Sequence, residues 1–246
     1  MSAPLLSIII PAYNEERRLP NTLASIQKFL KKQTYSAEVL VVENGSSDST
    51  FAIAEDIQKT FPDLTAMHID ARGKGIAVKT GILKAQGQYR FICDADLSMP
   101  IEELNRFLPP KLKNIDIAIA SRETPGAVRY NEPPYRHNIG RIFNWMVQLM
   151  LLPGLQDTQC GFKCFSAEVS KRVFPLQTIN GWTFDVEVLF IARKMGYLIK
   201  EIPIPSYYDP FSKVKFMRDS VQMGLDLIKI RYNYIWGHYA EKKSTY

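Results

Sequence analysis

Short apolar runs alternate with amphipathic stretches along the first half of the chain. Between the runs, hydrophobic residues recur at helical spacing, as Leu19, Leu23 and Ile26 do. Continuous apolar strands separated by helices are typical of a mostly parallel sheet that is flanked by helices on both faces. The pattern therefore predicts an α/β fold, with strands at residues 5–10, 38–42, 64–69, 90–93 and 115–120.

Polar residues follow these predicted strands. The carboxyl ends of parallel strands lie along one edge of a sheet, which is where such folds bind ligands. We therefore expect a single crevice at this edge, lined by Glu15, Glu43, Lys74, Asp94, Asp96 and Arg122.

The second half of the chain alternates less regularly. A loop rich in proline and charge at 123–136 is long enough to act as a functional lid. Residues 157–163 indicate a loop that enters a strand. The remaining predicted elements are helices at 137–152, 166–174 and 182–196 and a strand at 199–204.

The last predicted helix, at 216–239, is amphipathic in an unusual way, because it has two apolar stripes. The first stripe contains Met217, Val221, Leu225, Ile228, Tyr232 and Ile235. The second contains Met223, Leu227, Ile230 and Tyr234, and a polar stripe contains Arg218, Gln222, Asp226, Lys229 and Asn233. Two apolar faces need two partners. One is the core, and the other is a membrane surface, a second subunit or more core.

Composition narrows the possible partners. The chain has 246 residues, 46% of them hydrophobic, and 31 basic against 25 acidic residues, a net charge of +6. The basic excess gathers at 211–246, which suits an anionic partner such as a phospholipid, a phosphorylated lipid or nucleic acid. No signal peptide and no membrane-spanning run is predicted, so we expect a soluble or peripheral protein. Cys93, Cys160 and Cys164 show neither metal nor disulfide spacing, which favours a reducing compartment.

The strand at 90–93 ends in the sequence Asp94-Ala95-Asp96. Magnesium and manganese ions are hard cations that bind through one or two carboxylates together with substrate phosphates. An isolated Asp-x-Asp occurs often by chance, so the motifs around it decide its meaning.

Four motifs occur in a specific order: 10–16, 41–50, 73–75 and 94–96. In sequence and spacing they resemble the inverting family 2 glycosyltransferases, which have the GT-A fold. Residues 157–163 and 182–187, and the ending from 212 to 232, resemble the branch that transfers glucose to dolichyl phosphate. The resemblance covers nearly the whole chain.

The chain departs from this branch in three places. Glu43-Asn44 replaces the usual acidic pair, and Ser98 stands where related mannosyltransferases have a glutamine. The N-terminal membrane anchor of the eukaryotic enzymes is absent. This last departure predicts a prokaryotic homologue that acts on a polyprenyl phosphate at the cytoplasmic leaflet.

The resemblance implies a metal-dependent hexosyltransferase that moves glucose from UDP-glucose to a polyprenyl phosphate. Asp94 and Asp96 would hold Mg²⁺ or Mn²⁺, with Asp96 as the direct ligand. The nucleotide-binding residues would be Pro11, Ala12, Tyr13, Glu15, Glu43, Lys74, Asp94 and Ala95. The catalytic residues would be Asp96, Arg122, Asp157 and Asp185, and the acceptor phosphate would contact Arg122, Lys213 and Arg218. Because a phosphate monoester is already anionic near neutral pH, a general base is optional.

The same resemblance divides the chain and suggests its location. Residues 1–210 would form the catalytic domain, with a nucleotide-binding half at 1–122 and an acceptor half at 123–210. Residues 211–246 would form a C-terminal amphipathic helical segment. The protein would act peripherally at the cytoplasmic face of a membrane, as a homo-oligomer or beside a membrane partner protein.

Three alternatives remain. Within the family, mannosyl transfer from GDP-mannose is the nearest. A nucleotidyltransferase would have a glycine-rich, basic loop after its first strand, where this chain has Pro11-Ala12-Tyr13-Asn14-Glu15. A non-enzymatic anion or nucleic-acid binder conflicts with the acidic strand ends, which repel phosphates when no metal is present. We therefore expect no nucleic-acid partner.

Overall fold

The structure is a computed structural model. It describes residues 3–112, 115–209 and 216–240, and the side chains of 216–218 lie outside this description. The first half of the chain forms β1 (Leu6–Ala12), α1 (Leu19–Leu30), β2 (Ala37–Glu43), α2 (Thr50–Gln58), β3 (Leu64–His68), α3 (Lys74–Lys84), β4 (Tyr89–Ile92), the 3-10 helix η1 (Ile101–Phe107) and β5 (Ile117–Ser121).

The second half adds shorter strands and the longest helices. Its elements are β6 (Val128–Tyr130), α4 (Pro134–Met150), β7 (Lys163–Ser166), α5 (Ala167–Val173), the 3-10 helix η2 (Phe174–Leu176), α6 (Phe184–Lys194), β8 (Ile199–Pro203), β9 (Pro205–Tyr207) and α7 (Phe216–Ile235).

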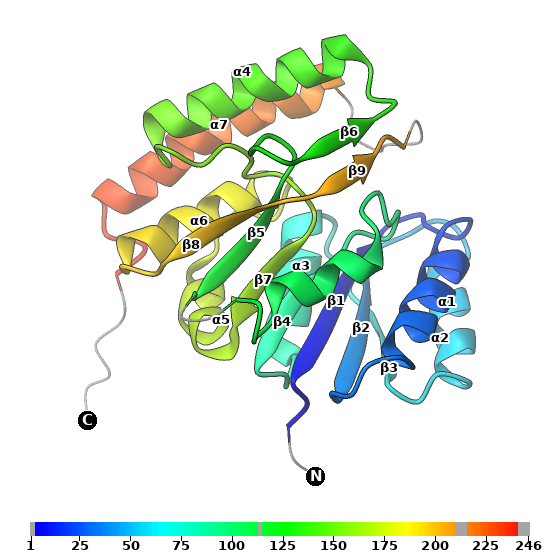
Figure 1. Cartoon of the computed structure of the whole chain (residues 1–246). Coiled ribbons are helices and arrows are strands. Elements are labelled where there is room, and N and C mark those ends of the chain that lie inside the picture. Colours follow the sequence, from blue (N-terminus) through cyan, green and yellow to red (C-terminus); the bar gives the residue numbers. More distant parts are fainter. Residues whose placement is uncertain (1–2, 113–114, 210–215, 241–246) are drawn as a thin grey trace, which may run out of the picture.

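In the described part of the chain, a seven-stranded sheet has the order β3-β2-β1-β4-β7-β5-β8 (Figure 1). Strands β1 to β4 are parallel to one another, as are β5 and β8. Only β7 runs antiparallel to its neighbours β4 and β5. The predicted mostly parallel sheet is therefore confirmed.

The antiparallel β7 decides which loops meet. Its first residue, Lys163, pairs with Ile92 at the end of β4 and with Ile119 near the end of β5. The loop before β7 therefore ends at the edge of the sheet where β4 is followed by Asp94 and Asp96. Without the reversed strand, that loop would lie at the opposite edge.

Side chains that alternate along the strands form a separate core on each face of the sheet. Ile8 and Ile10 of β1 face α1, α2 and η1, whereas Ile9 faces α3 and the helices of the second half. Strands buried on both faces explain the continuous apolar runs of the sequence.

Several predicted boundaries were wrong. The loop expected at 123–136 contains β6, which pairs in parallel with β9 in a second, two-stranded sheet, and α4 begins at Pro134. The strand expected at 199–204 is β8, and the short strand β9, which was not predicted, follows it at Pro205–Tyr207. The last helix ends at Ile235, just before Gly237, whose φ of 72° lies in the left-handed region.

Helices α4 and α7 lie side by side on one margin of the molecule (Figure 1). No helix among residues 3–112, 115–209 and 216–240 is long and apolar enough to cross a membrane.

Candidate active site

A cavity of about 570 Å³ opens at the carboxyl edge of the sheet. It contains most of the residues that the sequence assigned to a site, although they come from separate elements. Those that line it are Pro11, Tyr13, Glu15, Lys74, Asp94, Ala95, Asp96, Arg122 and Asp185. The predicted crevice therefore exists as a single cavity.

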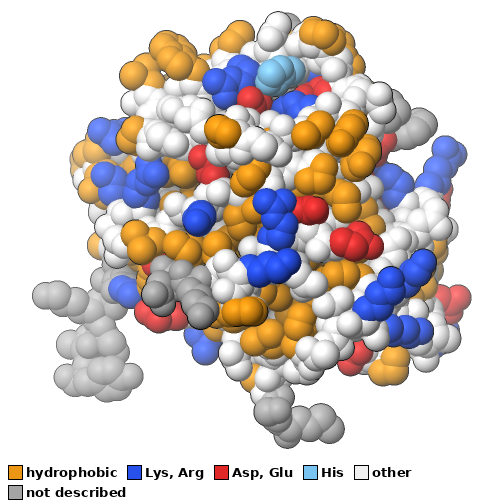
Figure 2. Space-filling model, viewed as in Figure 1, with side chains coloured by type: hydrophobic (Ala, Val, Ile, Leu, Met, Phe, Trp, Pro, Cys, Tyr) orange, Lys and Arg blue, Asp and Glu red, His pale blue; other side chains and the backbone are white. Residues whose placement is uncertain are grey.

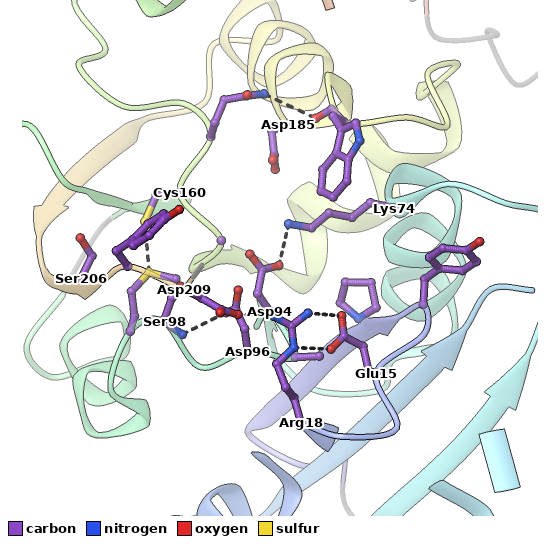
Figure 3. Close-up of a pocket in the computed structure, with 18 of the residues that line it drawn as sticks. Glu15, Arg18, Lys74, Asp94, Asp96, Ser98, Cys160, Asp185, Ser206 and Asp209 are labelled. Atoms are coloured by element: carbon purple, nitrogen blue, oxygen red, sulfur yellow. Dashed lines mark hydrogen bonds and ion pairs between the residues drawn. The ribbon is translucent and has the colours of Figure 1, made fainter. Parts of the chain in front are cut away.

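The two acids after β4 lie in different surroundings. Lys74 Nζ lies 2.6 Å from Asp94 Oδ1, whereas Asp96 Oδ1 accepts a hydrogen bond from the backbone N–H of Ser98 at 2.9 Å (Figure 3). Burial would raise the pKa of Asp94, but Lys74, Lys163 and Arg122 outweigh it and lower that pKa. Burial and the neighbouring Asp94 together raise the pKa of Asp96. Asp96 is therefore the acid that an added cation would stabilise most.

The donor set around these acids fits Mg²⁺ or Mn²⁺. Both side chains offer oxygen ligands, which hard cations prefer. Gly161 makes room for them, because a Cβ there would lie 2.2 Å from Asp94 Oδ2. The described residues contain no group of three or more His, Cys, Asp or Glu side chains that could enclose a metal. Phosphate and water oxygens would therefore have to complete the coordination, as they commonly do for Mg²⁺.

A buried ion pair forms the opposite wall of the cavity. Lys163 is fully buried, and its Nζ lies 2.9 Å from Asp185 Oδ1 and donates to the backbone oxygen of Cys160. Burial raises the pKa of Asp185, although Lys163 and Lys74 oppose that shift. In Figure 3, Asp185 points across the cavity toward Asp94. The sequence motif contained Lys163, but only the structure shows that it pairs with Asp185.

Arg122 and Asp157 form a second ion pair, which links β5 to the loop before β7. The guanidinium donates to both oxygens of Asp157, at 2.7 and 3.0 Å, and the Arg122 backbone N–H donates at 3.0 Å. Burial alone would raise the pKa of Asp157, but Arg122 lowers it to about 2. So acidic a group is a poor proton acceptor near neutral pH. Asp157 is not among the described residues that line the cavity, and it supports Arg122 from behind.

Glu43 also lies behind the cavity wall. It is buried, it accepts from the backbone N–H of Ser46, and it bonds to His68 Nδ1 at 2.5 Å. Its neighbour Asn44 lines the cavity. In the amide orientation that satisfies both groups, Asn44 donates to the backbone oxygen of Ala12 at 2.9 Å and accepts from Gly73 N at 3.0 Å. Glu43 and Asn44, where the chain departs from the family pattern, thus connect the ends of β1, β2 and β3. Asn44 itself lines the cavity.

Most of the arginines of the cavity were not predicted from the sequence. Those that line it without having been predicted are Arg18, Arg72, Arg129 and Arg136. Arg18 donates to both oxygens of Glu15, each at 2.6 Å, and forms an ion pair with Asp209 (Figure 3). Arg18 and Arg72 flank the motifs at 10–16 and 73–75 without belonging to them, whereas β6 and α4 bring Arg129 and Arg136 to the cavity from a distant segment.

The far end of the cavity is basic and aromatic. Arg129 of β6 is paired with Glu123 and Glu132. The Arg136 guanidinium, in the first turn of α4, lies 5.1 Å from the centre of the Tyr208 ring. Of the other residues predicted to bind the acceptor phosphate, Lys213 and the side chain of Arg218 lie outside the described residues.

Helices α4 and α7 expose many apolar side chains next to this end. The following side chains are all more than half exposed: Tyr135, Ile142, Trp145, Leu149, Val221, Leu225, Ile228, Tyr232, Ile235 and Trp236. Figure 2 shows hydrophobic side chains along the upper margin of the molecule, where α4 and α7 run in Figure 1. Exposed apolar surface of this extent marks an interaction site. We call it the α4–α7 face.

Comparison with known proteins places this fold and site in a class. The sequence model of the family described as Glycosyl transferase family 2 matches residues 7–174. The chain belongs to glycosyl transferase family 2, and is therefore an enzyme that transfers sugars. A Dictyostelium discoideum protein named dolichyl-phosphate beta-glucosyltransferase is 34% identical, in an alignment that covers 94% of this chain and 75% of that protein. The Mus musculus protein of the same name is 32% identical, over 97% of this chain and 78% of its own.

A solved structure shares the fold. It is glucosyl-3-phosphoglycerate synthase from Mycobacterium tuberculosis, in complex with Mn²⁺, UDP-glucose and phosphoglyceric acid. Its TM-score is 0.65 at 17% identity, and the alignment covers 92% of this chain and 79% of that one. The predicted GT-A fold is thereby confirmed.

Proposed function

We propose that the protein transfers glucose from UDP-glucose to a polyprenyl phosphate of the dolichyl type. The names of its relatives support glucose as the sugar and dolichyl phosphate as the acceptor, and the sequence resemblance supports UDP-glucose as the donor. The structural observation that carries it is a single cavity with two unlike ends. One end presents Asp94, Asp96 and Lys74. The other presents Arg122, Arg129 and Arg136, of which the first two are paired with acids. A nucleoside diphosphate and a second phosphate can therefore lie beside each other in one cavity.

The donor belongs at the acidic end. Asp96 and Asp94 would hold Mg²⁺ or Mn²⁺, which when bound offsets the negative charge that develops on the diphosphate leaving group. Lys74 adds a fixed positive charge beside them. Pro11, Tyr13 and Glu15 lie at the end of β1 and would contact the base and ribose. Asp185, held by Lys163, would accept a hydrogen bond from a sugar hydroxyl.

The acceptor phosphate belongs at the basic end. Its oxygen attacks the anomeric carbon of glucose, and the bond between that carbon and the UDP oxygen breaks. The nucleophile needs no base, because its second pKa is about 6. Arg122, Arg129 and Arg136 would hold the phosphate, and guanidinium groups suit such oxygens through paired hydrogen bonds. Asp157 would act by orienting Arg122.

The α4–α7 face would attach the enzyme to the membrane that contains its acceptor. Arg136 in the first turn of α4 and Asp219 in the first turn of α7 both line the cavity, so the apolar face begins at the cavity mouth. Tyrosine and tryptophan in that face suit the headgroup layer. Basic side chains near an anionic leaflet would add about 1 kcal/mol each.

We infer that this membrane surface is the cytoplasmic one. The three cysteines are buried free thiols, as is typical of a reducing compartment. A homo-oligomer or a membrane partner protein that covers the same face is the alternative to direct lipid contact.

A panel of nucleotide sugars tests the substrate pair. The purified protein is incubated with polyprenyl phosphate, Mn²⁺ and UDP-glucose, GDP-mannose or UDP-galactose, each with a labelled sugar. We expect label in the organic phase with UDP-glucose. Faster transfer from GDP-mannose would move the assignment to the mannosyl branch.

A further inference from the structure

The carboxylate of Glu187 joins three separate parts of the chain. Glu187 lies on α6, two residues after Asp185, and is fully buried. It accepts from the backbone N–H groups of Thr178 and Ile179 at 3.0 and 2.8 Å, and from the Thr178 hydroxyl at 2.6 Å. It also accepts from the hydroxyl of Tyr239, beyond α7, at 2.7 Å. Glu187 is not among the described residues that line the cavity, so its effect on the site must pass through these partners.

The residues that Glu187 holds belong to a segment, 177–182, that packs against the start of α3. The backbone oxygen of Asn180 accepts from Gly75 N at 2.8 Å, and Gln177 Nε2 donates to the backbone oxygen of Gly75 at 2.9 Å. The approach is close, because a Cβ at Gly73 would lie 2.2 Å from the Asn180 oxygen. The segment thus fixes the backbone on both sides of Lys74.

Lys74 is the side chain that depends on this packing. Its Nζ lies 2.6 Å from Asp94 and 5.7 Å from the ring centre of Trp182, which belongs to the same 177–182 segment. A shift of the segment would therefore move both the lysine beside the acidic pair and the aromatic ring next to it.

The last helix takes part in the same network. Asn233 of α7 donates to the hydroxyl of Thr178 at 3.1 Å and to that of Tyr239 at 3.3 Å. Both Asn233 and Tyr239 are buried, whereas Ile228 and Tyr232 on the other side of α7 belong to the exposed α4–α7 face. One side of the helix therefore faces the surface, and the other supports the segment that packs beside Lys74.

We propose that Glu187 is a positioning residue for donor binding: it fixes the 177–182 segment and, through it, Lys74, and it depends on the α7 end of the chain to do so. Lys74 contacts the donor only under the proposed function, so the role of Glu187 rests on that function. A buried carboxylate with four donors is well suited to hold a segment in one arrangement.

The test measures UDP affinity by calorimetry in the presence of Mn²⁺. Tyr239→Phe removes a single hydroxyl and leaves Glu187 its donors from Thr178 and Ile179. Loss of one hydrogen bond to a charged group should weaken UDP binding about threefold to tenfold, and Glu187→Gln should weaken it more. Tyr35→Phe is the matched control, because that hydroxyl donates to Asn105 at 2.7 Å on the other face of the sheet. It should leave UDP affinity unchanged.

A double-mutant cycle separates positioning from general stability. If Glu187 acts through Lys74, the effect of Tyr239→Phe should largely vanish in a Lys74→Met background. If Glu187 only stabilised the fold, Tyr239→Phe would lower the melting temperature and leave the UDP affinity of the folded protein unchanged. Unchanged affinity in Tyr239→Phe, or effects that add fully with Lys74→Met, would overturn the proposal even if Glu187→Gln fails to fold. Wild-type protein that does not bind UDP at all would overturn the proposed function as well.

Discussion

Asp94 and Asp96 are one residue apart, yet their surroundings give them different chemistry. Asp94 has Lys74 as a close partner and lies beside Gly161. The pKa of Asp96, in contrast, is raised by burial and by the neighbouring Asp94. A carboxylate destabilised in this way gains most from a cation. Asp96 is therefore the residue on which metal-dependent transfer should depend most.

Asp96→Asn keeps the shape of the side chain and removes its charge. We expect transfer to fall at least about 100-fold, as when a key group that stabilises transition-state charge is lost, while the melting temperature stays near that of the wild type. EDTA should abolish activity of the wild-type enzyme. Asp63→Asn, at an exposed carboxylate just before β3, is the control. Full turnover in excess EDTA would exclude the metal.

The ion pair between Asp157 and Arg122 leads to a prediction about the free energy of unfolding. Replacing Asp157 by Asn leaves Arg122 without its partner, and breaking a buried ion pair costs about 3 kcal/mol or more. The folded pKa of about 2 lies below the ordinary 3.8, so the ionised pair stabilises the fold above pH 4 and is lost as the pH falls toward 2.

Urea unfolding of the wild type and Asp157→Asn checks this. The gap between their free energies of unfolding should be constant from pH 7 to pH 5 and should narrow below pH 4. A gap that does not change with pH would mean that the carboxylate charge is not what stabilises the loop.

Sequence alone identified residues that belong to contiguous motifs, such as Lys74, Asp94 and Asp185. It could not identify Arg129 or Arg136, because a single basic residue in a segment predicted to be a loop looks like any solvated charge. It also could not show that Asp157 lies behind the cavity. These roles depend on which segments the fold brings together.

At the scale of elements, α7 presents apolar side chains on two sides. Leu227 and Ile230 are buried, whereas Leu225 and Ile228 are more than half exposed. The expected polar stripe was wrong in part, because Asp226 and Asn233 are buried. The reason for Asn233 is its hydrogen bond to Thr178, a partner that no helical periodicity can reveal.

Helix α4 carries apolar side chains on two sides: Val147 is buried and Met146 packs against the core, yet other apolar side chains are exposed. Asn144 is buried and donates to the backbone oxygen of Leu155 at 3.2 Å, while Trp145 and Leu149 are exposed by 64% and 71%. Hydropathy alone would place the apolar residues inside. A helix with one apolar side in the core and a second one exposed needs a second apolar partner.

Liposome binding tests the partner of the α4–α7 face. The double variant Leu149→Ser, Ile228→Ser should bind anionic liposomes at least roughly tenfold more weakly than the wild type does. The reason is that each apolar side chain contributes about 1.5–3 kcal/mol when fully buried. The UDP affinity of the variant should not change. Binding of the wild type should also weaken at high salt.

Leu83→Ser, Leu198→Ser is the matched control, since both leucines are exposed elsewhere on the surface. Wild-type protein that stays in the supernatant at low salt would assign the face to a second subunit or a membrane partner protein.

At the scale of the molecule, the reversed strand β7 builds the site. It brings the loop with Gly161 to the acids after β4, and places Lys163 beside Asp185. The apolar pattern predicted the strands and the α/β class. It could not predict the direction of β7, because a short buried strand has the same pattern whichever way it runs.

Nucleotide preference is a property of the whole cavity. In the presence of Mn²⁺, UDP should raise the melting temperature more than GDP does at the same concentration. A ligand at about 100 times its dissociation constant adds ~2.7 kcal/mol, which for a chain of this size is a shift of about 5–10 °C. A larger shift with GDP would favour mannose as the transferred sugar.

Glucosyl transfer to a lipid phosphate is tested most directly by the identity of its product. Wild-type enzyme is given UDP-glucose, Mn²⁺ and a polyprenyl phosphate, and the organic phase is analysed by mass spectrometry and by NMR of the anomeric carbon. We predict one added hexose in the β configuration, inverted from the α-linked donor. Free glucose in the aqueous phase with no glycosylated lipid, or a product that retains the α configuration, would contradict it.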